Sequence, residues 1–312
     1  MKKKCRILLI GGNGFIGSHL QDCLLKEEYN VRVFDRSREL FRKPLKHVDY
    51  FNGDISDICL LEKAIAGCDL VIYLAHSPAP RNDIDFFYDE ASNNLEDFTK
   101  FLRVVSKSSV EKIVYFSSGG TVYGQPQEIP TPEDHQLKPI SSYGAVKVAM
   151  EIYLNMYCHH HDKEYLVVRP ANPYGPRQNY RGSQGVISIF MHHILNNKPL
   201  NIWGSGEIRK DYIYVEDLAR ATVSLMQSGV KNQVFNLGSG VGISLLEIVS
   251  LIEKVTGKLA ILKKEKSLNT DIRHFILDCT KFHSFVGEKP ATTGLTDGVK
   301  ATYRWLKDEN FK

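Results

Sequence analysis

The chain has 312 residues, and its 40 Lys and Arg against 36 Asp and Glu give a formal net charge of +4. This length exceeds the roughly 250–300 residues of a single hydrophobic core, so we expect two lobes. The small excess of positive charge does not favour a nucleic-acid partner. No apolar run approaches the roughly 18 residues of a membrane span, so none is expected. Six scattered cysteines without a CxxC pair favour reduced thiols in a cytoplasmic protein.

A glycine-rich turn is the first segment of the chain that indicates a ligand-binding site. It follows an apolar run that ends at Ile10, and its glycines are Gly11, Gly14 and Gly17. Gly11 suits a tight strand-to-helix turn, Gly14 lets phosphates approach the backbone, and Gly17 allows a helix to pack closely on the strand. The start of that helix adds N–H groups and a positive dipole. The segment therefore predicts a binding site for a dinucleotide pyrophosphate.

An acidic residue follows at the position that this type of site requires. Residues 31–35 alternate as a second strand, and Asp35 lies eighteen residues beyond Gly17, near the spacing of about 20 typical of an acid that binds the adenosine ribose. Its carboxylate would accept from the ribose 2′-hydroxyl and repel a 2′-phosphate, which favours NAD over NADP. Arg36 favours NADP instead, because a basic residue next to the acid can bind the 2′-phosphate.

Later segments continue the alternation of strands and helices. Short apolar runs at 69–75, 112–117 and 165–169 each follow a helical pattern, which predicts a doubly wound parallel α/β (Rossmann) sheet over residues 1–171. Ligands in such sheets bind at the carboxyl ends of the strands. From residue 172 the composition changes, and we expect a smaller mixed α/β substrate lobe over 172–312, with a helix at 185–197. Segments within 211–240 are expected to return to the first domain.

Tyr143 and Lys147 are the candidate catalytic pair. They lie four residues apart on a helix predicted from Ser141 to about Tyr157, so they share one face. A tyrosine that acts as a base at neutral pH needs its pKa lowered by about 3 units, and we expect Lys147 and a positive nicotinamide to contribute. Tyr303 and Lys307 repeat the spacing, which we interpret as a structural helix face.

Together these segments resemble the extended short-chain dehydrogenase/reductase family, particularly the nucleotide-sugar epimerases of the UDP-galactose 4-epimerase type. The matching elements are the turn at 11–17, Asp35, Gly53-Asp54, Leu74-Ala75, Asn94-Leu95, residues 117–124, Tyr143 with Lys147, and residues 169–175, 203–217 and 235–239.

The resemblance implies NAD-dependent inversion of a nucleotide-activated hexose at C4 through a 4-keto sugar, with UDP-glucose and UDP-galactose expected first. A UDP-glucuronate or UDP-N-acetylhexosamine 4-epimerase stays open, as does a sensor or scaffold protein that binds NAD without catalysis. The uronate reading needs a cation near the sugar carboxylate, for which Arg81 and Arg177 are candidates. The resemblance also implies a homodimer formed through two helices of each subunit.

Residue roles follow from the same resemblance, including Asp54 and Ile55 at the adenine. The cofactor set is Gly11, Gly14, Phe15, Ile16, Gly17, Asp35, Arg36, Asp54, Ile55, Leu74, Ala75, Asn94, Ser117, Tyr143, Lys147 and Pro170. The substrate set is Thr121, Asn172, Arg209, Phe275 and Arg273. In the second set, a guanidinium fork and an amide donor suit the diphosphate oxygens.

Two departures from the family pattern affect the site. Gly119 stands where these epimerases carry a catalytic Ser or Thr, so Thr121 or Ser118 would supply that hydroxyl unless both only stabilise a turn. Leu268 stands where the family has a diphosphate-binding Arg, and Lys266 or Arg273 would have to replace it.

Two further features narrow the reaction and its substrate. Gly120 and Thr121 replace the Asp-Glu pair with which the related sugar 4,6-dehydratases eliminate water, so elimination lacks its acid and base. Phe275 aligns with a bulky aromatic found in enzymes confined to plain hexoses, and a core residue is the alternative interpretation.

A metal site is not expected. The runs Cys158-His-His-His161 and His192-His193 place neighbouring side chains in different directions and lack an acidic partner at ligand spacing.

Overall fold

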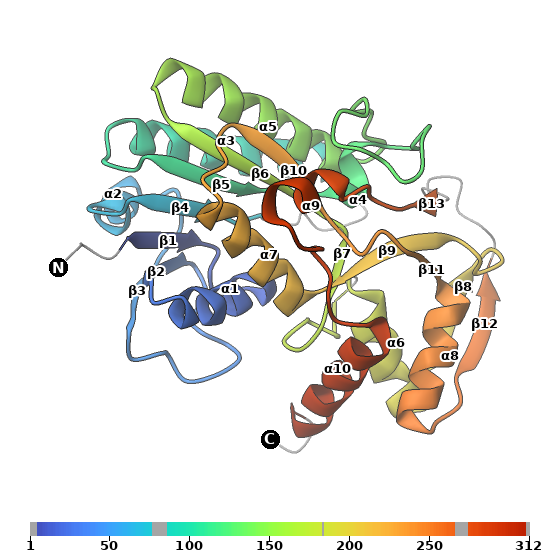
Figure 1. Cartoon of the computed structure of the whole chain (residues 1–312). Helices are drawn as coiled ribbons and strands as arrows, with labels where there is room; N and C mark the ends of the chain where they lie inside the picture. The colour runs from blue at the N-terminus through green and yellow to red at the C-terminus, as the bar shows by residue number, and fades with distance from the viewer. Residues whose placement is uncertain (1–4, 77–85, 183, 266–273, 310–312) are drawn as a thin grey trace. The chain divides into compact units, whose positions relative to one another are not determined.

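The computed structural model describes residues 5–76, 86–182, 184–265 and 274–309 (Figure 1). The chain divides into two compact units. Unit 1 comprises Met1–Gly124, Leu137–Arg169 and Thr222–Phe235, and unit 2 comprises Gln125–Gln136, Pro170–Ala221 and Asn236–Lys312.

The predicted doubly wound sheet is confirmed. Seven strands pair in the order β10-β6-β5-β4-β1-β2-β3, and strands β1 to β6 pair in parallel. The strands are β1 (Arg6–Ile10), β2 (Asn30–Asp35), β3 (Val48–Asn52), β4 (Leu70–Tyr73), β5 (Lys112–Phe116), β6 (Glu164–Pro170) and β10 (Gln233–Leu237). Strand order reverses between β1 and β4, and ligands of such sheets bind at this switch, outside the carboxyl ends of the strands.

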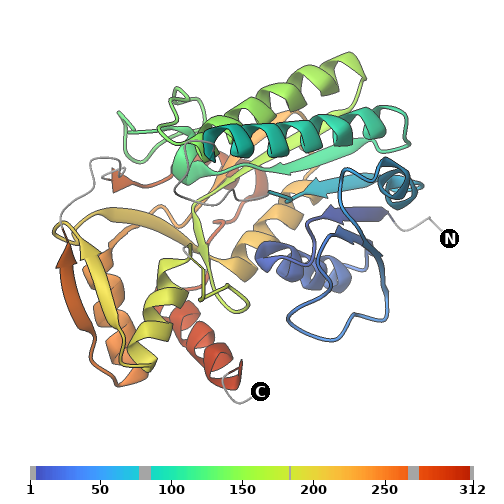
Figure 2. The same cartoon turned by 180° about the vertical axis from the view of Figure 1, so that it is seen from behind.

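Helices cover both faces of this sheet. The helices of this part of the chain are α1 (Phe15–Lys26), α2 (Ile58–Ile65), α3 (Phe86–Ser106), α4 (Gly119–Val122) and α5 (Ser142–His160). Figures 1 and 2 show α3 and α5 side by side on one face and α1 on the other. Because both faces are covered, the central strands are buried throughout, and Leu8, Ile72 and Val114 have no exposed surface.

Strand β3 was not predicted from the sequence. It is the edge strand beyond β2, where Val48 is buried while Asp49 is exposed. An edge strand keeps polar residues on its open side. Its residues therefore lack the continuous apolar run by which the inner strands were recognised.

Unit 2 is a mixed α/β unit. In one sheet β9 (Arg209–Tyr214) pairs with β7 (Asn172–Tyr174), β11 (Gly242–Ser244) and β13 (His274–Phe275), of which β11 is antiparallel. In a second sheet β8 (Pro199–Trp203) pairs with β12 (Ile261–Glu265). Helices α6 (Val186–Leu195), α8 (Leu245–Thr256) and α10 (Leu295–Glu309) pack around a buried core that includes Ile187, Met191 and Ile252.

Only part of the segment 211–240 joins the seven-stranded sheet. Strand β9 lies in the unit 2 sheet, whereas β10 forms an edge of the large one, and helix α7 (Val215–Gln227) connects them. A short helix, α9 (Thr280–Val286), precedes α10 in the chain.

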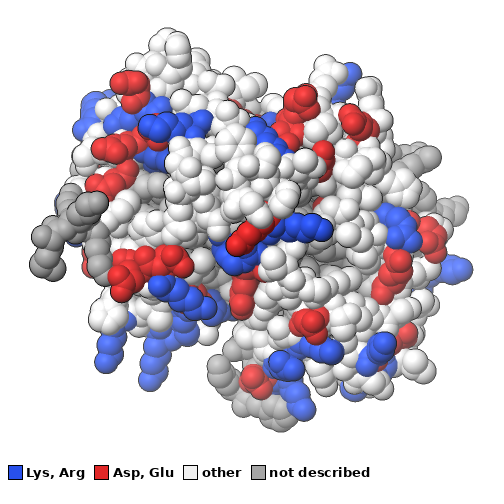
Figure 3. Space-filling view, viewed as in Figure 1, with Lys and Arg blue, Asp and Glu red and all other residues white. Residues whose placement is uncertain are grey.

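On the face displayed in Figure 3, basic and acidic side chains are intermixed among uncharged ones over the described residues. Among the described helices, none has both the length and the apolar composition for crossing a membrane.

Candidate active site

A cleft of about 260 Å³ opens in unit 1 at the carboxyl ends of β1, β2, β3 and β4. It brings together eight of the predicted cofactor residues: Gly11, Gly14, Asp35, Arg36, Asp54, Ile55, Leu74 and Ala75. The cleft is also lined by residues that the sequence analysis did not assign to the cofactor: Ile10, Asn13, Phe34, Ser37, Leu40, Gly53, His76 and Asp97. Each lies close to the carboxyl end of a parallel strand or, for Asp97, on α3. Proximity to a strand end is the signal in the sequence that could have identified most of them.

The glycine turn has room for phosphates. Gly11 has φ +80, and a Cβ there would lie 2.9 Å from the Ala75 nitrogen, so the fold itself requires glycine. At Gly14 the backbone is ordinary (φ −74), and a Cβ would approach nothing closer than Gly11 O at 3.4 Å. Since Gly14 caps the start of α1, ahead of Phe15 and Ile16, the open space lies at a helix N-terminus, where a pyrophosphate binds.

Asp35 is held by two backbone donors at the end of β2. Its Oδ2 accepts from the Asn13 nitrogen at 2.9 Å, and its Oδ1 accepts from the Ser37 nitrogen at 2.8 Å. A carboxylate has about four acceptor positions. Both oxygens therefore keep capacity for ribose hydroxyls while their orientation is already set.

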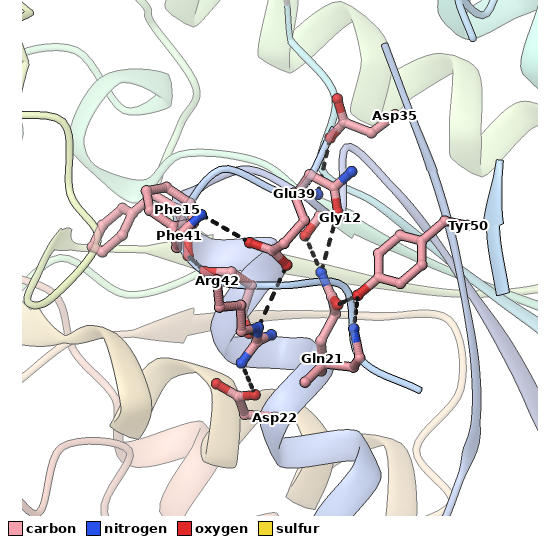
Figure 4. A network of polar contacts seen from close by, with 12 residues as sticks. Gly12, Phe15, Gln21, Asp22, Asp35, Glu39, Phe41, Arg42 and Tyr50 are labelled. Carbon is pink, nitrogen blue, oxygen red and sulfur yellow. Dashed lines mark hydrogen bonds and ion pairs between the residues drawn. The ribbon is translucent and has the colours of Figure 1, made fainter. Parts of the chain in front are cut away.

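A polar network supports the glycine turn from the side of α1 (Figure 4). The Gln21 amide donates to Gly12 O at 2.8 Å, and Tyr50 donates to Gln21 Oε1 at 3.0 Å. In the loop after β2, Arg42 forms an ion pair with Asp22 of α1. These contacts stabilise the turn and the loop without using any group of the cleft wall.

Asp54 is ionised at neutral pH. Its Oδ1 accepts from the Ser56 nitrogen at 2.9 Å and the Ser56 hydroxyl at 2.7 Å, and these hydrogen bonds lower the pKa of Asp54 below its usual value. The adjacent Ile55 is buried. The pair offers a hydrogen-bond acceptor beside an apolar surface, which suits the edge and face of an adenine ring.

Tyr143 and Lys147 lie on the first two turns of α5, which begins where Ser141 accepts from the Gly144 nitrogen at 3.1 Å. The Lys147 ammonium donates to Phe116 O at 2.9 Å and lies 5.6 Å from the centre of the Tyr143 ring. Burial lowers the pKa of Lys147 to about 8, although Glu151 and Glu90 oppose the shift.

The pKa of Tyr143 does not fall in the protein alone. Burial raises it to about 12, while the hydrogen bond with Ser118 acts in the opposite direction. Lys147 by itself therefore does not bring this pKa down to neutral pH, because the cost of burying a phenolate is the larger effect, and the joint contribution of Lys147 and a positive nicotinamide stays a prediction. A further positive charge beside the phenol is needed to make Tyr143 a base at neutral pH.

Ser118 and Thr121 differ in what their hydroxyls contact. Ser118 occupies the N-cap of α4 without a capping bond from its side chain, and its hydroxyl is hydrogen-bonded to Tyr143. The Thr121 hydroxyl is buried and has no partner within the described part of the chain. The structure thus places Ser118 at the phenol, next to the position that Gly119 leaves without a side chain.

Ser117, at the end of β5, belongs to a buried ionic network with Glu151 and Arg169. Its hydroxyl donates to Glu151, which is paired through both carboxylate oxygens with Arg169, at 3.0 and 2.6 Å. Arg169 also donates to the Tyr123 hydroxyl at 2.9 Å. The Ser117 hydroxyl is thus used inside the protein by Glu151, which lies one turn of α5 beyond Lys147.

Two unpredicted residues adjoin Tyr143. His76 follows Leu74-Ala75 at the end of β4, and its Nε2 lies 2.6 Å from Oε1 of Glu90 on α3. The imidazole meets the Tyr143 ring edge-on, with 4.7 Å between ring centres. Asn94, one turn further along α3, donates to Glu90 O at 2.9 Å.

The predicted substrate residues of unit 2 are engaged in internal contacts. Asn172 donates to Asp211 O at 2.8 Å. Arg209 donates to Gly242 O at 2.8 Å and pairs with Glu247 at 3.1 Å. Phe275 is 2 % exposed on β13.

Other sequence predictions are accounted for as follows. Pro170 is buried at the end of β6. Arg81, Lys266, Leu268 and Arg273 lie outside the described residues, so their predicted roles stay predictions. Tyr303 packs against the unit 2 core, as a structural helix face predicts. None of the six cysteines forms a disulfide within the described residues, and no three metal-ligating side chains cluster anywhere in the described ranges.

A family model described as "NAD dependent epimerase/dehydratase family" matches residues 7–238. The chain belongs to this family. Its description names NAD as the cofactor, and the open glycine turn, the oriented Asp35 and the Asp54 and Ile55 pair fit that molecule.

Individual relatives cover nearly the whole chain. A protein of Methanocaldococcus jannaschii named "Putative UDP-glucose 4-epimerase" is 34% identical over 97% of this chain and 99% of its own length. An Escherichia coli protein named "dTDP-4-dehydro-6-deoxyglucose reductase" is 32% identical over 95% of this chain and 96% of its own. The solved UDP-glucose 4-epimerase of Thermotoga maritima with UDP-glucose superposes with a TM-score of 0.91 at 31% identity, covering 98% and 99% of the two chains.

Proposed function

We propose that this protein is an NAD-dependent 4-epimerase of a nucleotide-activated hexose, with UDP-glucose and UDP-galactose as its substrates. The observation that carries the proposal is the placement of Tyr143, Lys147 and Ser118 together in unit 1, on the unit that holds the dinucleotide cleft. The names of the Methanocaldococcus and Thermotoga relatives support the choice of nucleotide sugar.

In the proposed mechanism the chain binds, orients and moves a proton. Asp35 binds the adenosine ribose, and the turn at Gly14 binds the pyrophosphate. Tyr143 would remove the proton of the C4 hydroxyl while C4 gives up its hydride, leaving a 4-keto sugar, and would return the proton when hydride is added back to the other face of C4. NAD, when bound, supplies the hydride acceptor and donor and also the positive charge that favours the phenolate.

Ser118 and Lys147 assist Tyr143 in this scheme. The Ser118 hydroxyl donates either to the phenolate or to the C4 oxygen, and Lys147 offsets the negative charge of the phenolate. In unit 2, Asn172 and Arg209 are proposed for the diphosphate. Each keeps donors beyond its internal contact, because the Asn amide has two N–H groups and the guanidinium has five.

The experiment that tests the proposal is a panel of UDP-, GDP- and dTDP-sugars incubated with NAD-loaded protein, with inversion at C4 followed by NMR. UDP-glucose and UDP-galactose should interconvert without net consumption of cofactor. Stoichiometric oxidation of reduced cofactor by a 4-keto sugar would instead make the protein a reductase, like the named function of the Escherichia coli relative. Inversion of UDP-glucuronate or a UDP-N-acetylhexosamine alone would keep the reaction and correct the sugar.

We further propose a homodimer in the cytoplasm. Ile152, Tyr153 and Met156 on α5 are 62 %, 42 % and 50 % exposed, and such a group of apolar side chains suits burial against a second copy. Light scattering should give twice the mass of the chain, and the double variant Ile152→Glu, Met156→Glu should give a folded monomer. Leu259→Glu, at an exposed apolar residue of unit 2, is the control and should stay dimeric. Cysteines that form no disulfide within the described residues are typical of a reducing compartment.

A further inference from the structure

The immediate surroundings of Tyr143 contain an acid and an imidazole that the proposed mechanism does not use. Glu90 is 2 % exposed, and the His76 side chain is 13 % exposed. The two come from different elements, the carboxyl end of β4 and the helix α3, and meet at 2.6 Å. Removing a carboxylate and an imidazole from water costs free energy unless the groups are paired, and here they pair with each other.

The protonation of the pair follows from its burial. Burial and the Lys147 ammonium lower the pKa of His76 to about 3, so the imidazole is neutral at neutral pH. A neutral imidazole carries one N–H, and the contact with Glu90 places it on Nε2. The other nitrogen, Nδ1, has no partner among the described residues. Glu90 therefore controls both the tautomer and the orientation of the ring.

The ring that Glu90 holds is the one that meets Tyr143 edge-on at 4.7 Å. Edge-on aromatic contacts have a preferred geometry and resist rotation of either ring. We infer that His76 and Glu90 are positioning residues for Tyr143: Glu90 holds the imidazole through Nε2, and the imidazole holds the phenol ring in place beside Ser118. This inference rests on the proposed role of Tyr143 as the base.

The pair also acts on Tyr143 through charge. In the described structure the titratable or polar groups around the phenol are His76, Glu90, Tyr115, Ser118, Lys147 and Glu151. Of these, Glu90 raises the pKa of Tyr143 and opposes formation of the phenolate. A residue that only filled space would not combine this charge with the contact to His76.

The direct test is the ionisation of Tyr143 in NAD-loaded protein, followed by tyrosinate absorbance as the difference from Tyr143→Phe in the same background. Glu90→Gln keeps the size of the side chain and an oxygen that accepts from His76, but removes the negative charge. The Tyr143 titration should move down by about one pH unit. Glu96→Gln removes a charge from the exposed face of the same helix and should leave the titration unchanged.

The second test separates positioning from folding. His76→Leu fills a similar volume without the N–H donor, and should lower kcat at least about tenfold with little change in KM. His76→Gln can restore a donor to Glu90 and should recover part of that loss. Thermal unfolding of each variant must remain cooperative, as in the wild type.

The inference is overturned if Glu90→Gln does not shift the Tyr143 titration, or if His76→Leu retains wild-type kcat. It is also overturned if His76→Leu loses kcat only in proportion to a loss of folded protein. The titration needs no sugar, so it decides the inference even where no nucleotide sugar is turned over, an outcome that would count against the proposed function alone.

Discussion

The two units differ in how their predicted ligand residues are occupied. In unit 1 the groups assigned to the cofactor line one cleft, and Asp35 already has the orientation that a ribose requires. In unit 2, Asn172 and Arg209 donate to backbone carbonyls, Arg209 also pairs with Glu247, and Phe275 is buried. A preorganised site binds without the cost of rearrangement, whereas an occupied guanidinium must exchange one partner for another.

This difference predicts which unit determines cofactor affinity and which determines selection of the sugar nucleotide. Cofactor binding should depend on the rigid turn and on Asp35, because these are held by the backbone and by the network of Figure 4. Selection of the sugar nucleotide should respond to small changes in unit 2, because its donors exchange between internal and external acceptors.

The largest expected effect tests unit 1. Tyr143→Phe removes only the proton-transfer group, so turnover should fall by about 10²–10⁴ while NAD affinity and folding are retained. Steady-state kinetics and a cofactor titration measure the two. Tyr303→Phe is the control, and a loss of activity in that variant with normal turnover in Tyr143→Phe would reassign the catalytic motif.

The next effect distinguishes two hydroxyls. Ser118→Ala should lower kcat by about 10²-fold, as for the loss of one donor at a reacting oxygen, because Ser118 contacts Tyr143. Thr121→Val should keep near-normal turnover, since the Thr121 hydroxyl forms no hydrogen bond with Tyr143. The reverse ranking of the two kcat values would contradict the structural assignment.

Burial of the Lys147 ammonium should lower the free energy of unfolding. The pKa of Lys147 is lowered to about 8 in the folded chain, against about 10.4 when unfolded. Between these values the unfolded chain binds more protons, so this group makes stability rise with pH, and below pH 8 its full penalty of about 3 kcal/mol applies.

Lys147→Met should therefore raise the free energy of unfolding at pH 7 by about 1–3 kcal/mol and flatten its slope between pH 8 and 10. Urea denaturation at several pH values measures both quantities. A less stable variant at pH 7 would mean that the bond to Phe116 O outweighs the cost of burying the charge.

Cofactor choice should follow Asp35. NAD should bind more tightly than NADP. Asp35→Asn should weaken NAD binding about tenfold and should reduce the preference for NAD over NADP, because it removes the charge that repels a 2′-phosphate. Calorimetric titration of cofactor-free protein measures both affinities. Arg36 lines the same cleft, and tighter NADP binding in the wild type would assign it the dominant role.

The smallest expected effect tests unit 2. If Phe275 limits the sugar pocket, UDP-galactose should be favoured over UDP-N-acetylgalactosamine, and Phe275→Ser should narrow the ratio of kcat/KM several-fold. Because Phe275 is buried, Phe275→Ser also destabilises the protein. Phe275→Leu, which keeps an apolar side chain at this position, is therefore the matched comparison. An unchanged ratio in both variants would leave Phe275 as a core residue.

The proportion of the protein predictable from its sequence also differs between the units. Periodicity and glycine spacing were sufficient for the inner strands and the glycine turn, because a buried parallel strand is continuously apolar and a tight turn needs Gly11. The edge strand β3 and the short strands of unit 2 lack such a pattern. Their pairing depends on neighbours distant in the chain.

For the site, the sequence alone determined the residue types and their order: the glycine turn, Asp35, and Tyr143 with Lys147 on one helix face. Tertiary structure decided which hydroxyl meets the phenol, that burial raises the pKa of Tyr143 to about 12, and that His76 and Glu90 join it. The physical reason is range. Spacing within one helix or turn is a local property, whereas desolvation and contacts between β4, α3 and α5 exist only after segments far apart in the chain have packed together.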